Sequence, residues 1–172
     1  KELSKNKSTA NFIFTCNAGH LEPDHWLLDT SKGGGRLLGE ACHFVDLLRF
    51  LAGSKINEVS SLAMDTECLD SVSIHLKFND GSIGVINYLS NGSKSLPKER
   101  LEVFCNGSVL QLNNFRVLRG FGWPGFKYKK LWRQDKGQIN CSRAFIDAIN
   151  SGDNSQLIPF EEIIEVTRAC FN

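Results

Sequence analysis

The chain lacks several features that would assign it to a broad class of protein. No apolar stretch approaches the length of a membrane span, because the longest candidate, 44–52, is interrupted by Asp46 and Arg49. Residues 1–11 are polar and show no signal-peptide pattern. The net charge is only +1, and a near-neutral chain has no overall field that attracts nucleic acid or an anionic membrane. We therefore expect neither nucleic acid nor a membrane among its partners.

The cysteines lack the spacing of a redox or metal motif. None of the six forms a C-x-x-C pair, and the chain is long enough to build a core without disulfides. Most lie among apolar neighbours, which favours reduced core residues and a cytoplasmic location. Cys16, Cys42, His20, His25 and His43 match no zinc spacing, so we expect no metal.

Size and composition indicate one ordinary globular domain. The chain has 172 residues, of which 41% are apolar and 23% charged. It contains no internal repeat and no low-complexity tract. It begins with Lys1 instead of Met, which suggests a piece of a longer protein. We expect residues 1–172 to form a single domain.

Short apolar and alternating runs predict a series of strands. They cover residues 11–16, 55–66, 71–78, 83–89, 101–105, 109–112 and 116–119. The segments Asn79-Asp80-Gly81 and Asn106-Gly107 predict hairpin turns, because glycine accepts the positive φ that tight turns require. Helical spacing predicts helices over 36–52, ended by Gly53, over 138–150, and from Pro159 onward.

This order of elements predicts an α+β fold with a mostly antiparallel, open-faced sheet and helices packed on one face. Alternation in 71–78 places Val72, Ile74, Leu76 and Phe78 on the buried face. The opposite face is expected to carry Ser73, His75 and Lys77, mixed with Tyr88 and Phe104. Such a half-polar face can meet solvent or another subunit.

The two last helices are each expected to bury an apolar stripe. In 138–150 the stripe is Cys141, Phe145, Ala148 and Ile149. In the helix that begins at Pro159 the apolar positions are Phe160, Ile163, Ile164, Thr167, Cys170 and Phe171.

The helix 36–52 carries the side chains that point to chemistry. A rotation of about 100° per residue places Arg36, Glu40 and His43 on one stripe. The core face on the other side is made of Leu37, Leu38, Ala41, Phe44, Val45, Leu48 and Ala52. Gly39 and Asp46 lie beside the stripe, and a glycine lets a ligand approach the backbone closely.

His43 is the natural general acid/base of this stripe, because a histidine ordinarily titrates near neutral pH. Glu40, one turn earlier, is placed to tune or orient the imidazole. The triplet Gly33, Gly34 and Gly35 leaves free backbone N–H groups for an anionic or hydroxyl-rich ligand. Two alternatives stay open: a solvated helix face with an i, i+4 ion pair, and glycines that only form a linker.

The loop 17–32 offers further pocket residues. Asn17 is expected beside the substrate, and His25 and Trp26 present rings that pack on the apolar faces of sugars. A tryptophan that anchors the loop in the core is the alternative for Trp26. Residues 121–133 interleave aromatic side chains with Lys127, Lys129, Lys130 and Arg133. That composition is found on single-stranded nucleic-acid surfaces, but the neutral overall charge favours a sheet edge or loop with solvated lysines.

The segment from Gly33 to Gly53, with its glycine triplet and His43-x-x-Asp46, resembles the signature of the Gfo/Idh/MocA oxidoreductase family. The stretch 17–29 is similar to the loop of one branch of that family, associated with bacterial surface-polysaccharide or sugar metabolism. The stretch 158–168 resembles the family's closing helix. The resemblance extends over almost the whole chain, and the glycine-to-Asp46 block is its most specific part.

The resemblance implies the α+β half of a two-domain enzyme. The other half would be a Rossmann domain that binds NAD or NADP and supplies a lysine, and this chain has neither G-x-G-x-x-G after a strand nor the family's glutamate-lysine-proline motif. His43 would be the acid/base or hydroxyl-binding histidine, and Asp46 would support the helix or the ligand site. Gly33, Gly34, Gly35 and Gly39 would lie near the cofactor. The open sheet face would form a homo-oligomer.

One position departs from the family pattern. Many members carry an aspartate four residues before the histidine, where this chain has Gly39. Glu40 is adjacent, but it points about 100° away around an α-helix.

The leading hypothesis is the substrate-binding domain of an oxidoreductase that transfers hydride between NAD(P) and a sugar, sugar nucleotide or polyol. His43 and Glu40 would be catalytic, and Asn17, His25, Trp26, Arg36 and Asp46 would surround the substrate. Alone, the chain is expected to bind no cofactor tightly and to be inactive. The alternative is a non-catalytic sugar-binding or oligomerisation module.

Overall fold

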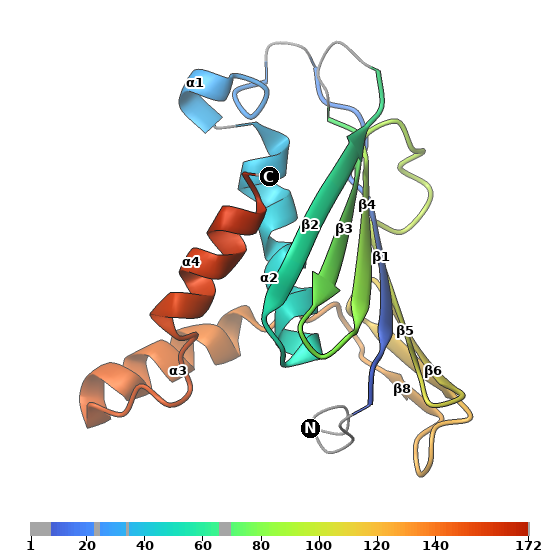
Figure 1. Ribbon diagram of the computed structural model, residues 1–172, viewed down its shortest axis with the longest axis vertical. Coiled ribbons are helices and arrows are strands. Elements are labelled where there is room, and N and C mark those ends of the chain that lie inside the picture. The colour runs from blue at the N-terminus through green and yellow to red at the C-terminus, as the bar shows by residue number, and fades with distance from the viewer. Residues whose placement is uncertain (1–7, 23–24, 34, 66–69, 172) are drawn as a thin grey trace.

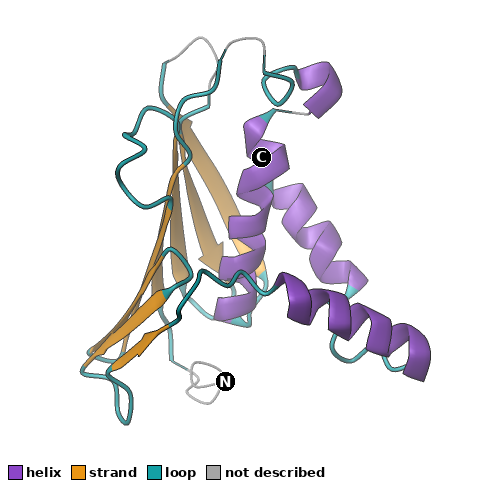
Figure 2. Ribbon diagram, turned by 180° about the vertical axis from the view of Figure 1, so that it is seen from behind, coloured by secondary structure: helices purple, strands orange, loops and turns teal. Residues whose placement is uncertain are grey.

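The computed structural model describes residues 8–22, 25–33, 35–65 and 70–171. One twisted sheet forms one layer, and helices lie against one of its two faces (Figures 1 and 2). This arrangement confirms the α+β prediction of a mostly antiparallel, open-faced sheet with helices on one face. None of the helices in the described residues is both long and apolar enough to span a bilayer.

The sheet has eight strands in the order β2-β3-β4-β1-β5-β6-β7-β8. Their bounds are β1 Asn11–Asn17, β2 Ile56–Ala63, β3 Val72–Phe78, β4 Ile83–Leu89, β5 Glu99–Cys105, β6 Ser108–Asn113, β7 Val117–Phe121 and β8 Tyr128–Lys130. β1 is central, parallel to β4 and antiparallel to β5. The predicted strand 55–66 ends earlier, at Ala63, and its last position, 66, lies outside the described residues.

Both predicted hairpin turns are present, with different geometries. Asn106 and Gly107 have φ of 48° and 71°, and they connect β5 directly to β6 as a two-residue turn with positive φ at both positions. Between β3 and β4 the Gly81 N–H donates to the Phe78 carbonyl at 3.0 Å, and Gly81 has φ of 88°. The Phe78 N–H also donates to the Ser82 carbonyl at 2.9 Å, so these two residues close a three-residue loop, 79–81, with a left-handed glycine at its end.

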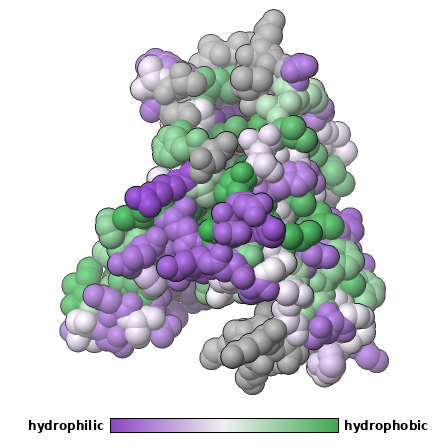
Figure 3. Space-filling model, in the orientation of Figure 1, coloured by the Kyte–Doolittle hydropathy of each residue, from purple (hydrophilic) through white to green (hydrophobic). Residues whose placement is uncertain are grey.

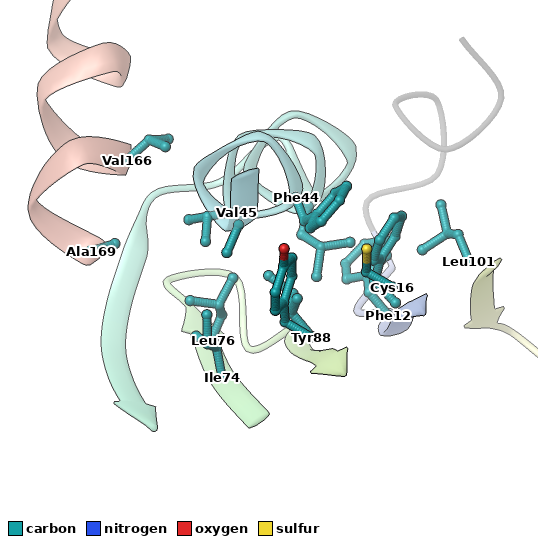
Figure 4. Packing of buried hydrophobic residues seen from close by; sticks show 14 of the residues in the cluster. Phe12, Cys16, Phe44, Val45, Ile74, Leu76, Tyr88, Leu101, Val166 and Ala169 are labelled. Carbon is teal, nitrogen blue, oxygen red and sulfur yellow. The ribbon is translucent and has the colours of Figure 1, made fainter. Parts of the chain in front are cut away.

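The hydrophobic core lies between the sheet and helix α2, Cys42–Ala52. Phe44, Val45 and Leu48 of α2 pack on the strands, and the rings of Phe14 and Phe44 stack at 4.3 Å between centroids. Figure 4 shows Phe44 and Val45 of the helix above Leu76 and Tyr88 of the strands. α2 ends at Gly53, whose φ is 61°, as predicted.

The last two helices only partly confirm the predicted stripes. α3, Gln138–Ser151, stands away from the sheet (Figures 1 and 2). Of its predicted stripe only Ala148 is buried, while Cys141, Phe145 and Ile149 are exposed. α4, Phe160–Ala169, buries Val166 and Ala169 instead of Phe160, Ile163 and Phe171, which are exposed. Helical spacing correctly indicated helices, but α4 presents a different face to α2, and the stripe of α3 has no matching surface in the described chain.

The predicted assignment of side chains to the two faces of the sheet is correct for β3 and wrong for one residue of β4. Val72, Ile74, Leu76 and Phe78 are buried, and Phe104 is exposed on the other face, as predicted. Tyr88 was expected on the outer face but is fully buried. Both faces of β4 carry apolar side chains, so alternation alone does not decide which side packs against α2.

The described cysteines, 16, 42, 105, 141 and 170, are free thiols. Only Cys16 is fully buried, and Cys141 is exposed, so the prediction that they are core residues holds for part of the set. Burial raises the pKa of the Cys16 thiol to about 11, which keeps it protonated. The basic and aromatic segment 121–133 contains the edge strand β8, where its lysines are exposed, as the sheet-edge interpretation predicts.

Candidate functional site

A π-helical turn, Leu37–Ala41, precedes α2 and determines where the candidate residues point. A π-turn holds more residues than an α-turn, so side chains beyond it are rotated from the ideal α-helical positions. Such turns inside helices are frequent at functional sites. The expected stripe of Arg36, Glu40 and His43 is therefore wrong: Arg36 is buried beneath the turn, Glu40 is half-buried, and His43 is exposed. Gly39, within the turn, is also exposed.

Arg36 is the centre of a buried polar network. Its guanidinium donates to the Gly19 carbonyl at 2.8 Å and to the Tyr88 hydroxyl at 3.1 Å. It also forms an ion pair with Asp70 at 3.3 Å, and lies over the Tyr88 ring at 5.4 Å from the centroid. Asp70 in turn accepts from the Ser90 hydroxyl at 2.7 Å. Arg36 therefore joins the loop after β1, the end of β4 and the segment before β3.

Glu40 is held by two partners, neither of which is His43. The Tyr88 hydroxyl donates to one carboxylate oxygen, and the Lys98 ammonium donates to the other at 3.2 Å. Burial alone would raise the pKa of Glu40, but these two donors and the nearby Arg36 charge outweigh it and leave the pKa below its ordinary value. Burial and the Glu40 carboxylate together raise the pKa of Tyr88. Glu40 is therefore an anion that accepts hydrogen bonds, and Tyr88 is a neutral donor.

Figure 4 shows how the Tyr88 side chain lies in the core. Its ring rises from β4 among the apolar core residues, and its hydroxyl points toward the helix that carries Phe44 and Val45. Because the hydroxyl bonds with both Arg36 and Glu40, the ring links the buried core of the sheet to the start of α2.

Asn17 anchors the segment 90–98 that joins β4 to β5. Its amide donates to the carbonyls of Ser93 and Leu96 at 2.7 and 3.2 Å. The Oδ1 atom of Asn17 is buried and has no hydrogen-bond partner among the described residues. A Cβ added to Gly92 would lie 1.9 Å from that atom. The glycine therefore makes the space into which the Asn17 amide fits.

The Gly92→Ala variant is expected to lower the free energy of unfolding by about 1–3 kcal/mol, because the added methyl group displaces the Asn17 amide from the segment it anchors. Urea denaturation of the variant measures this loss. In Asn17→Ala the obstacle is already gone, so adding Gly92→Ala should then cost much less. Equal costs in both backgrounds would contradict the steric explanation.

His25, Trp26 and the glycines lie in the loop between β1 and the π-turn. The His25 Nδ1 atom accepts from the Leu27 N–H at 3.2 Å, and its ring stacks on Trp26 at 6.1 Å between centroids. Trp26 is 59% exposed, so it does not anchor the loop in the core. Gly33 ends the short helix α1, Thr30–Gly33, Gly34 lies outside the described residues, and Gly35 has φ of 85°.

Asp46 faces α4. Burial and the neighbouring Glu162 carboxylate raise its pKa, against the opposing charges of His43 and Arg49. Arg49, itself buried, pairs with Glu162 at 3.3 Å and Glu165 at 3.0 Å and holds α4 against α2. A groove of about 920 Å³ lies beside these pairs, between α4 and β2. Hydrophilic side chains gather over α4 on this side of the molecule (Figure 3).

The structure thus brings Arg36 and Glu40 together with Tyr88, Lys98 and Asp70, and places Asn17 at the base of the adjoining segment 90–98. The sequence did not indicate that Tyr88, Lys98 and Asp70 belong to this network. They come from distant segments, and no local pattern links them to the helix. His43 and Asp46 lie further along, in α2, and no hydrogen bond or ion pair links them to this network in the described residues. His25 and Trp26 lie in the loop before the π-turn.

The glycines before the π-turn do not have the setting of a Rossmann pyrophosphate site in the described residues. A pyrophosphate site of the Rossmann type needs a glycine-rich turn between a strand and a helix. Here Gly35 follows the short helix α1 and precedes the π-turn, with no strand leading into it.

One family model matches more than half of the chain, and several solved structures share its fold. A family model described as the GFO/IDH/MocA C-terminal domain matches residues 8–111. A dehydrogenase from Clostridium difficile is structurally similar over 99% of this chain and 55% of its own, with 20% sequence identity and a TM-score of 0.75. An aldose-aldose oxidoreductase from Caulobacter crescentus, complexed with glycerol, matches 99% of this chain and 55% of its own at 14% identity and a TM-score of 0.74.

A third solved structure contains a nucleotide. GenD2 from gentamicin A biosynthesis, in complex with NAD, matches 95% of this chain and 51% of its own, with 18% identity and a TM-score of 0.66. The chain therefore spans about half the length of the solved proteins it matches. No protein of curated function matches the chain by sequence.

Proposed function

The chain belongs to the GFO/IDH/MocA C-terminal domain family, and from that premise we propose that it is the substrate-binding part of an NAD(P)-dependent oxidoreductase acting on a sugar, sugar nucleotide or polyol. The observation that carries the proposal is the start of α2, where a π-turn containing Gly39 lies between a buried charged network and an exposed histidine, His43. The NAD complex of GenD2 and the glycerol complex of the aldose-aldose oxidoreductase support the cofactor and the polyol-like substrate class.

In this proposal each residue has a distinct task. His43, on the exposed side of α2, takes up the proton of the substrate hydroxyl that is oxidised. Glu40 and Arg36 supply charges beneath the substrate, and their contacts hold the loop after β1 in place. His25 and the exposed Trp26 cover the substrate with their rings, and Asp46 supports α2. A separate unit of the protein holds the nicotinamide nucleotide.

The direct test is a screen of the intact protein for NADH or NADPH formation, followed by absorbance, with sugars, sugar nucleotides and polyols. We expect oxidation of at least one of them. The chain 1–172 on its own should show no micromolar binding of NADH in a fluorescence titration. A protein that oxidises no member of the panel with either cofactor would refute the proposed function.

We further propose that the open sheet face forms a homo-oligomer in a cytoplasmic enzyme. Apolar side chains at Ile13, Ile83 and Phe104 are partly exposed on that face. Placing a charge among them, as in Ile83→Lys, should weaken self-association at least about tenfold. Sedimentation velocity of the intact protein measures this. Ile146→Lys, on the exposed face of α3, is the control. A wild-type protein that is monomeric at high concentration contradicts the proposed interface.

A further inference from the structure

The segment 90–98 places a lysine at the border of the buried network. The segment contains Lys94 and Lys98 and no acidic residue. The Asn17 amide fixes its middle through the Ser93 and Leu96 carbonyls, as described above. The Asn17 backbone N–H also donates to the Lys98 carbonyl at 2.7 Å. Asn17, at the end of β1, therefore holds the backbone of the segment that ends at Lys98, through both its side chain and its main chain.

The ammonium group of Lys98 is held in position, but not all of its hydrogen-bond donors are used. Glu40 holds it at 3.2 Å, and its side chain remains 41% exposed. A lysine ammonium has three donors and no acceptor. In the part of the chain that the structure describes, Glu40 is its only hydrogen-bond partner. Two donors are thus available to a ligand, and the entropy of ordering the long side chain is already partly offset by the Glu40 contact.

The charges around Lys98 leave an excess of positive charge. Arg36 is matched by Asp70, and Glu40 is the one carboxylate that pairs with Lys98. Lys94 is exposed and makes no ion pair with any described residue. Its side chain lies beside Gly19, the residue whose carbonyl accepts from Arg36. A second cation therefore borders the same network without an acidic partner.

We propose that Lys98, together with Lys94 of the same segment, binds an oxyanion of the substrate, either a carboxylate or a phosphate. This inference rests on the proposed function, because it takes the substrate to be a sugar, and it narrows that class to anionic sugars. Glu40 and Tyr88 act as positioning residues that hold the Lys98 ammonium. Both oxygens of Glu40 already accept a hydrogen bond, one from Tyr88 and one from Lys98, which offsets part of the carboxylate charge that a bound oxyanion would meet.

The test compares matched neutral and charged sugars in binding to the intact protein, by isothermal titration calorimetry. The probes are glucose, glucuronate and glucose 6-phosphate, which separate a carboxylate from a phosphate preference. The wild-type protein is expected to bind one charged probe roughly tenfold or more tightly than glucose. Lys98→Met, which keeps the stem and removes the charge, should reduce that preference to about twofold or less. Lys98→Arg should keep most of it.

Lys127→Met is the matched control, because Lys127 is exposed on the distant sheet edge and outside the proposed site. Lys98→Gln preserves an N–H donor to Glu40 without the charge, and replaces the methionine variant if that variant fails to fold. Equal affinity of the wild type for charged and neutral probes, including no binding of any probe, overturns the proposal. So does an unchanged preference in folded Lys98→Met or Lys98→Gln.

The binding measurement and the oxidation screen fail independently. A charged-sugar preference that depends on Lys98, found in a protein that oxidises nothing with NAD(P), would keep the oxyanion site and reject the oxidoreductase. NAD(P)-dependent oxidation of neutral sugars, with kcat and KM unaffected by Lys98→Met, would keep the oxidoreductase and reject the oxyanion site.

Discussion

Replacing His43 with alanine in the intact protein is expected to lower kcat by about 100- to 10,000-fold, the usual contribution of a positioned general acid or base. His43 is exposed on α2, so its removal should leave the free energy of unfolding within about 0.5 kcal/mol of the wild type. The loss should therefore appear in turnover and not in folding. Initial rates of NAD(P)H formation with the best substrate of the screen, over a range of pH, measure it.

His75→Ala is the control for this variant, because His75 is an exposed histidine on β3 of the sheet. It should retain most of the wild-type turnover. If His43→Ala instead keeps full turnover, another residue performs the proton transfer. If the wild type shows no turnover but binds sugars, the chain fits a non-catalytic sugar-binding module. The absence of an acid at Gly39 and the engagement of Glu40 by Tyr88 and Lys98 are the observations that favour that second function.

Replacing Arg36 with methionine is expected to lower the free energy of unfolding by about 3–5 kcal/mol. Arg36 is 4% exposed, and its removal takes a donor from the Gly19 carbonyl and the Tyr88 hydroxyl and leaves the Asp70 carboxylate without its counter-ion. Such a loss is a large part of the stability of an ordinary domain. Urea denaturation followed by far-UV circular dichroism measures it, and the midpoint should fall without a large change in slope.

Two further variants show whether the geometry or the charge of the Arg36 side chain is responsible for this stability. Arg36→Lys keeps the positive charge but not the planar fork of donors, so it should recover only part of the lost stability. Arg133→Met removes an exposed arginine near the sheet edge and should change the free energy of unfolding by less than about 0.5 kcal/mol. A nearly neutral Arg36→Met would mean that the network does not stabilise the fold.

The fold could be predicted because its signals are local. Alternation along 71–78 identified the buried face of β3, and the pair Asn106-Gly107 identified a turn that only a few residue types adopt. The same reasoning failed for α3, whose apolar spacing indicated a helix but not a covering surface. Amphipathic spacing shows that a face is apolar, while burial depends on what lies opposite to it.

The candidate site could be predicted only in part. The glycine-rich start of α2, His43 and Asp46 were recognisable from a contiguous motif. The partners of Arg36 and Glu40 were not, because Asp70, Tyr88 and Lys98 lie 34 to 58 positions away along the chain. The π-turn also changes which side chains before and after it share a face, and α-helical spacing gives no warning of such a turn.

The sequence by itself therefore determined most of the elements, though not α1, the π-turn or β8, together with the fold class and the family motif. Backbone conformation and side-chain period follow largely from neighbouring residues. Tertiary structure alone decided which charges meet. Arg36 became a buried structural cation, Glu40 a holder for Lys98, and Tyr88 a core residue with a polar tip. Those roles arise when β1, β4 and the segment before β5 bring their ends together around one helix. In that buried setting each polar group needs a hydrogen-bond or ion-pair partner, and the neighbouring sequence does not indicate which residue that partner is.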